Sequence, residues 1–118
     1  MLRGIRGATT VKSNSAAEIL SATKELLVQM VKANKIKTVD IAAAIFSATR
    51  DLNAEFPAKA ARKMGWTDVP LLCTYEIAVP GSIKRCIRIL LLVNTGKAQK
   101  GIKHIYLKGT KSLRTETE

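Results

Sequence analysis

The chain has few aromatic residues, few cysteines and few acidic residues, and each shortage narrows what the protein can be. Aromatics make up 4% of its 118 residues, so the core must be aliphatic and few rings are available to stack on nucleic-acid bases. The two cysteines, Cys73 and Cys86, form no CxxC pair and lie in apolar runs, which predicts reduced thiols in a reducing compartment. Only 9 Asp and Glu oppose 20 Lys and Arg. The resulting net charge of +11 favours an anionic partner: nucleic acid, anionic lipid or a small polyanion.

Long apolar runs are missing as well. The longest, residues 41–46 and 89–93, are too short to cross a bilayer. Gly4, Arg6 and Gly7 interrupt the apolar stretch that an N-terminal signal peptide would need. Hydrophobic residues still make up 47% of the chain, which is typical of a globular protein. We therefore expect one cytoplasmic domain over residues 1–118, without a membrane segment.

The pattern of apolar residues predicts a mixed α/β fold. Ser15-Ala16-Ala17-Glu18 forms a capping box, and the helical spacing of the apolar residues that follow predicts a helix to about Asn34. Pro57 and Gly65 bound a predicted short helix over residues 57–64. Strands are predicted at residues 2–11, 69–76, 85–93 and 102–107, with 85–93 at the centre of the sheet because it is the most apolar. Residues 39–48 fit either an Ala-rich helix or a buried strand.

Three charged residues stand inside segments that otherwise look like buried strands: Arg6, Glu76 and Arg88. A charge in such a place loses hydration and needs a partner, so the trio suggests a rigid anion-binding site. Each residue taken alone also has a structural explanation. Arg88 could pair with a carboxylate or reach solvent at an edge, the glycines around Arg6 could mark a bulge or a close backbone approach, and Glu76 could be solvated at a strand end. Cys73 and Glu76 have opposite strand parity, so they share one site only if the strand ends or bulges between them.

A second basic group lies on the predicted short helix. Lys59 and Arg62 are three residues apart and so share a face near the helix N-terminus, where they could bind a carboxylate. A solvated basic face is the alternative. The single histidine, His104, is assigned no role in a site, because a lone histidine is usually structural or exposed.

Several strings occur in one order through nearly the whole chain. Together they closely resemble the small, single-domain α/β chorismate mutases. The strings are Arg3-Gly4-Ile5-Arg6-Gly7-Ala8-Thr9-Thr10-Val11, Ser47-Ala48-Thr49 with Asp51-Leu52-Asn53, Phe56-Pro57-Ala58-Lys59-Ala60-Ala61-Arg62, Gly65-Trp66, Val69-Pro70-Leu71, Cys73 with Glu76, Val79-Pro80-Gly81-Ser82, Cys86-Ile87-Arg88 and His104-Ile105-Tyr106-Leu107.

The resemblance implies a five-stranded mixed sheet, with residues 39–48 as a strand, in a homotrimer whose sheets form a barrel-like core. It implies a rearrangement of chorismate to prephenate without cofactor or metal, in clefts between neighbouring subunits, and no nucleic-acid partner. One subunit would supply Arg6, Cys73, Glu76, Arg88 and Tyr106, with Arg88, Glu76 and Arg6 as the catalytic residues. Its neighbour would supply Phe56, Lys59 and Arg62. Leu113 and Arg114 would belong to a mobile tail, residues 108–118, that closes over the ligand.

The chain departs from the family pattern in two places. Ala78 stands where relatives often carry an acidic residue, and Thr115-Glu116-Thr117-Glu118 replaces a Pro-containing continuation. Two other functions fit the sequence less well. A trimeric enamine or imine deaminase shares the architecture only by general analogy. A nucleic-acid-binding module fits the charge, but the sequence holds no recognised motif for it.

Overall fold

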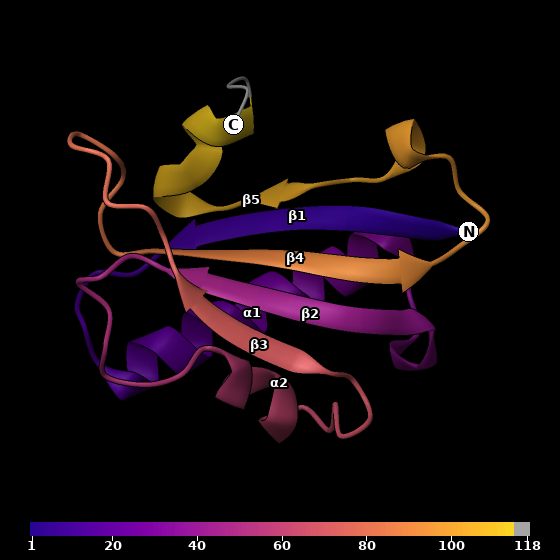
Figure 1. Cartoon of the computed structure of the whole chain (residues 1–118), viewed down its shortest axis with the longest axis horizontal. Coiled ribbons are helices and arrows are strands. Elements are labelled where there is room, and N and C mark those ends of the chain that lie inside the picture. The colour runs from indigo at the N-terminus through magenta and orange to yellow at the C-terminus, as the bar shows by residue number, and fades with distance from the viewer. Residues whose placement is uncertain (115–118) are drawn as a thin grey trace.

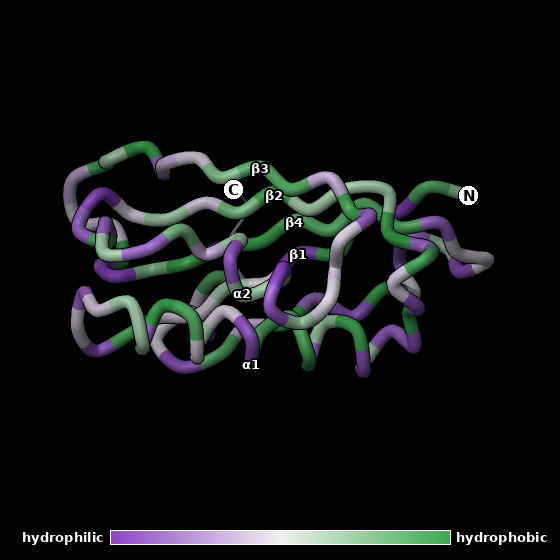
Figure 2. The backbone as a smooth tube through the Cα atoms, turned by 90° about the horizontal axis from the view of Figure 1, so that it is seen from below, coloured by the Kyte–Doolittle hydropathy of each residue, from purple (hydrophilic) through white to green (hydrophobic). Residues whose placement is uncertain are grey.

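In the computed structural model, which describes residues 1–114, both α-helices lie on the same side of one five-stranded sheet (Figures 1 and 2). The predicted fold class is confirmed. The strands are β1 (Leu2–Thr10), β2 (Ile41–Ala48), β3 (Leu71–Tyr75), β4 (Cys86–Asn94) and β5 (Ile105–Tyr106). The helices are α1 (Ala16–Asn34) and α2 (Ala58–Lys63), with 3-10 turns η1 (Thr38–Asp40), η2 (Gln99–Gly101) and η3 (Lys108–Arg114).

The sheet has the strand order β3-β2-β4-β1-β5. β4 is its central strand, as predicted, and runs antiparallel to both neighbours, whereas β2 with β3 and β1 with β5 are parallel pairs. The ambiguous segment 39–48 is a strand from Ile41 onward, preceded by η1. An irregularity in register between Ile41 and Ala43 lets both Ile41 and Ala44 face the core. β5 covers only two of the six residues predicted for it.

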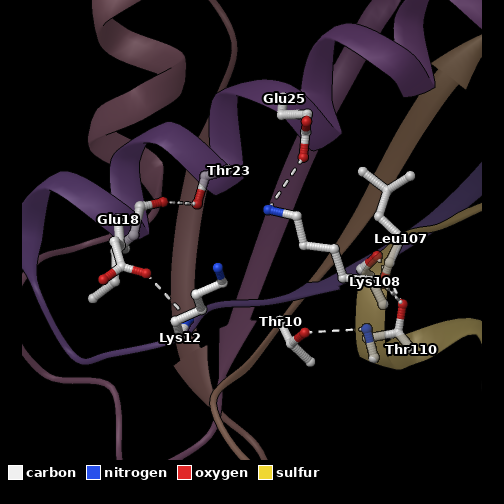
Figure 3. Close-up of polar contacts among 11 residues, drawn as sticks. Thr10, Lys12, Glu18, Thr23, Glu25, Leu107, Lys108 and Thr110 are labelled. Carbon is white, nitrogen blue, oxygen red and sulfur yellow. Dashed lines mark hydrogen bonds and ion pairs between the residues drawn. The ribbon is translucent and has the colours of Figure 1, made fainter.

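α1 begins where the sequence predicts, but only half of the expected capping box forms. The Ser15 hydroxyl accepts a hydrogen bond from the Glu18 backbone N–H over 3.1 Å. The Glu18 carboxylate does not return to Ser15. It accepts instead from the Lys12 backbone N–H, over 3.1 Å (Figure 3). It also accepts from the Ser13 hydroxyl. The helix start is therefore tied to the end of β1.

The core fills the space between the sheet and the helices. Ile5, Leu26, Phe46 and Leu91 are completely buried there. The layers are closest at Gly7, where an added Cβ would lie 2.4 Å from the Met30 sulfur. Gly7 therefore permits a close approach of β1 to α1, one of the two explanations that the sequence left open.

Within residues 1–114 the opposite side of the sheet carries no helix, and we call it the open face (Figure 2). Side chains alternate along a strand, so residues between the core positions project there. Ile45, Leu90 and Leu92 are half-buried, and Leu72 is 61% exposed. A monomer thus presents an unusually apolar sheet surface to solvent.

The chain returns to β1 after β5. Thr110 is fully buried, and its hydroxyl lies 2.7 Å from the Leu107 carbonyl (Figure 3) and 3.0 Å from the Ala8 carbonyl. The Gly109 N–H donates to the Thr10 hydroxyl over 3.1 Å. The start of η3 is therefore anchored. The mobility predicted for residues 108–118 stays a prediction, and the sequence departure at residues 115–118 lies outside the described residues.

Candidate active site

A shallow depression of about 310 Å³ on the open face brings together residues from β1, β2, β4 and β5 and the residue that follows β3. Four of the predicted site residues line it: Arg6, Glu76, Arg88 and Tyr106. They are far apart in sequence, and only the pairing of the strands brings them together. Two guanidinium groups and one carboxylate leave the depression with a net positive charge, which suits an anionic ligand.

Arg88 projects from the central strand and is oriented by Glu76. Its Nη1 donates to Glu76 Oε1 over 3.2 Å, and the two side chains are 31% and 21% exposed. Partial burial strengthens the pair and limits the freedom of the guanidinium. β4 has strands on both sides, so the backbone beneath Arg88 is also rigid. The result is a preorganised cation rather than a mobile surface arginine.

Tyr106 contributes a hydroxyl that is buried and finds no hydrogen-bond partner among the residues that the structure describes. Leaving such a group unpaired costs free energy, so a hydroxyl in this position beside two arginines is suited to an oxygen of an anionic ligand. Cys86 shares the Arg88 face of β4 but cannot act as a nucleophile there. Burial raises the pKa of its thiol to about 11 despite the opposing effect of Arg88, so the thiol stays protonated at neutral pH.

Within one protomer Cys73 does not line this depression, so its predicted place beside Arg6, Glu76 and Arg88 stays a prediction. It pairs with the buried Phe46 across the parallel β2–β3 ladder, so its side chain faces the helix layer. β3 ends at Tyr75, but the Glu76 N–H still donates to the Ala48 carbonyl over 2.9 Å. The strand alternation therefore continues past the end of β3 and places Glu76 on the open face.

Cys73 instead lines a hollow that also contains Phe56, at the β3 edge of the sheet. Phe56, just before α2, is 68% exposed. Lys59 forms an ion pair with Glu55 over 2.8 Å, and the exposed Arg62 lies beside Trp66. The predicted site residues thus form two groups, with Phe56, Cys73, Lys59 and Arg62 near β3 and Arg6, Glu76, Arg88 and Tyr106 on the open face.

Leu113 and Arg114 both belong to η3. The Arg114 side chain lies outside the part of the chain that the structure describes. Leu113 is half-buried. The predicted contact of these two residues with a ligand stays a prediction.

Asp51, named above only within a family-like string, anchors the start of the strand that carries Arg88. Its two carboxylate oxygens accept from the Arg85 backbone N–H over 3.2 and 3.0 Å, and Oδ1 also accepts from the Thr49 hydroxyl over 2.5 Å. The Thr49 hydroxyl in turn accepts from the Cys86 N–H over 3.0 Å. These bonds hold Arg85 at φ 47°, in the left-handed region that non-glycine residues rarely adopt. The Thr-x-Asp spacing, typical of side chains that bond nearby backbone, was the available signal.

Replacing Asp51 with asparagine is expected to lower stability by about 1 kcal/mol at pH 7, because charge-assisted bonds at an exposed site are lost. Desolvation acts to raise the pKa of Asp51, but the hydrogen bonds from Thr49 and from the Arg85 backbone outweigh it and lower that pKa. A lowered pKa stabilises the fold above the unfolded-state value of about 3.9 and ceases to do so as the pH falls through the folded-state value. Urea unfolding followed by Trp66 fluorescence should therefore show the difference at pH 7 and a smaller one at pH 3. Asp68→Asn, at an exposed position, is the control, and an equal loss at both pH values would contradict the prediction.

Comparisons with known proteins agree with this geometry. The family model for chorismate mutase type I matches residues 2–117. The curated chorismate mutase AroH of Thermus thermophilus is 47% identical, with 100% of this chain and 98% of the relative covered. The chain belongs to the type I chorismate mutase family. The family predicted from the ordered sequence strings is thereby confirmed.

Other members of the family extend the match. The chorismate mutase AroH of Bacillus subtilis is 45% identical, with 98% of this chain and 92% of the relative covered. A solved chorismate mutase from Clostridium thermocellum superposes with a TM-score of 0.91 at 52% identity, covering 92% of this chain and 97% of its own. Because these likenesses run along almost the entire chain, they favour a type I chorismate mutase over the deaminase and the nucleic-acid-binding module. No helix within residues 1–114 is long and apolar enough to cross a membrane.

Proposed function

We propose that this protein rearranges chorismate to prephenate, in a site that forms between neighbouring subunits of a homotrimer. The single observation that carries the proposal is the Arg88 guanidinium, which Glu76 holds over 3.2 Å beside the Tyr106 hydroxyl, a group without a hydrogen-bond partner within residues 1–114. The family membership names the substrate. The depression offers what that substrate needs, namely fixed cations for a small molecule with two carboxylates.

The reaction is unimolecular, because one C–O ether bond breaks as one C–C bond forms within the same molecule. No proton transfer and no nucleophile are needed, so the protonated thiol of Cys86 is no obstacle. The protein has two tasks. It holds a flexible dianion in its compact reactive conformer, and it stabilises the negative charge that develops on the ether oxygen as its bond lengthens.

We assign the second task to Arg88. Its guanidinium is fixed by Glu76 and by the central strand, so little reorganisation is needed when charge appears on the ether oxygen. Glu76 would also be within reach of the ring hydroxyl. Arg6 and Tyr106 would bind a substrate carboxylate at the β1–β5 edge of the depression.

The other group of site residues would come from the next subunit. The β3 edge, with Phe56, Lys59 and Arg62 near it, lies at one side of the sheet and β1 with β5 at the other (Figure 1). A head-to-tail contact that joins these two edges closes a ring when three subunits meet. It would bring Lys59 and Arg62 to the second carboxylate of the substrate. It would also place Phe56 and Cys73 at the rim of the depression.

The apolar open face supports the same assembly. In a monomer, water would contact the apolar surface formed by Ile45, Leu72, Leu90 and Leu92. Three such faces could pack together as a barrel-like core. The cytoplasmic location and the absence of a cofactor remain predictions from the sequence.

Loss of chorismate absorbance on adding the purified protein tests the proposal directly. We expect loss far above the spontaneous rate, with acid conversion of the product to phenylpyruvate as confirmation that prephenate formed. Light scattering on the same sample should give the mass of a trimer. Turnover no faster than the spontaneous reaction would overturn the proposed function, and a stable active monomer would overturn the shared site.

A further inference from the structure

His104 lies at the point where the segment after β4 meets β1, two residues from Tyr106. The Arg6 backbone N–H donates to its Nδ1 over 2.9 Å. Gly7 pairs with Ile105 and Ala8 with Tyr106, so His104 stands beside Arg6 where the β1–β5 pairing begins. An imidazole nitrogen, rather than a backbone carbonyl, satisfies the Arg6 amide.

This bond belongs to a pattern along the outer edge of β1. β5 is only two residues long, so in the described part of the chain most of β1 has no strand beside it on that side. Side chains make the hydrogen bonds to β1 that a longer β5 would otherwise make. The Gln99 amide bonds both the N–H and the carbonyl of Gly4, over 3.0 and 2.7 Å, and His104 bonds Arg6. Of these two contacts, only the one from His104 holds a residue that lines the depression.

The bond requires a neutral ring with its proton on Nε2, because a protonated Nδ1 cannot accept. Partial burial, with a smaller effect of the Arg6 charge, lowers the pKa of His104 below its ordinary value. On the facing strand β1, the charge that acts on His104 is that of Arg6. The ring is therefore an acceptor at neutral pH, as the geometry needs.

We infer that His104 is a positioning residue of the substrate site, which holds Arg6 through its backbone and aligns β5 so that Tyr106 faces the same depression. The inference rests on the proposed function, because it assigns Arg6 and Tyr106 to carboxylate binding. Arg88 is held separately, by Glu76 and by β4. Loss of the His104 bond should therefore weaken binding of chorismate and leave the chemical step nearly unchanged.

The test compares three variants. His104→Leu keeps much of the volume but removes the acceptor, and we expect KM for chorismate to rise roughly fivefold to thirtyfold with kcat within about twofold. His104→Asn offers an amide oxygen near the position of Nδ1 and should recover most of the lost affinity. Gln99→Leu is the matched control, because it removes a side-chain contact to the same strand away from the depression, and its KM should stay at the wild-type value.

Several results would overturn the inference. KM unchanged in His104→Leu, no recovery in His104→Asn, or an equal rise in Gln99→Leu would each show that the bond does not position the site. If His104→Leu does not fold, ¹⁵N NMR of the wild-type imidazole decides, since a proton found on Nδ1 rules the bond out. A wild-type protein that does not convert chorismate would refute the proposed function instead. In that case the His104–Arg6 bond can still be measured by the same NMR experiment.

Discussion

Replacing Arg88 with alanine is expected to lower kcat roughly 100- to 1,000-fold while KM for chorismate changes much less. The reason is that the guanidinium interacts most strongly with charge that exists only in the transition state, and losing one such donor in other enzymes costs about 2.7–4 kcal/mol. Binding of the ground state relies on the other cations. Steady-state kinetics at saturating chorismate separates the two effects.

Two further variants sharpen this test. Arg88→Lys keeps the charge but lacks the planar fork that Glu76 orients, so we expect only partial activity. A neutral isostere of arginine at position 88 should retain binding and lose most of the rate. Lys37→Ala removes a positive charge from an exposed residue whose side chain makes no cap bond to η1, and serves as the control for net charge. An unchanged kcat in Arg88→Ala would exclude the assigned role.

Mixing two inactive variants is expected to restore activity if the site is shared. Arg88→Ala lacks the arginine on the open face, and Arg62→Ala lacks the arginine on α2. In a mixed trimer, a site can therefore take an intact Arg88 from one protomer and an intact Arg62 from its neighbour. In a ring of three with random assembly at equal amounts, about one quarter of the sites receive both intact arginines. Chorismate turnover after refolding the mixture measures the recovered fraction.

The matched control uses two variants whose substituted residues belong to the same group of site residues in one protomer. Arg6 and Arg88 line one depression in one protomer, so mixing Arg6→Ala with Arg88→Ala should restore nothing. Native mass spectrometry confirms that mixed trimers have formed. No recovery for the Arg88 and Arg62 pair despite mixed trimers, or equal recovery for the control pair, would contradict a site divided as proposed.

Features set by neighbouring residues were predictable from the chain alone. The start of α1 at Ser15 and its end at Asn34 follow from a side-chain cap and from apolar spacing within the helix. The apolar run of β4 indicated the central strand, because a strand covered on both sides must be apolar throughout. Arg88 was conspicuous for the same reason, as a charge within that run.

Features that depend on distant partners were not predictable in this way. The sequence of Ile41–Ala48 fits either a helix or a strand, and its pairing with β3 and β4 makes it a strand. The continued alternation past Tyr75 sends Cys73 and Glu76 to opposite faces.

The chain alone thus specified the helix ends, the central strand and, through its ordered strings, the family. The faces that Cys73 and Glu76 occupy, and the acceptor that holds Arg6, emerge only in the folded sheet. The physical reason is that helix bonds close within four residues, whereas strand bonds and their side-chain substitutes join segments up to about a hundred residues apart.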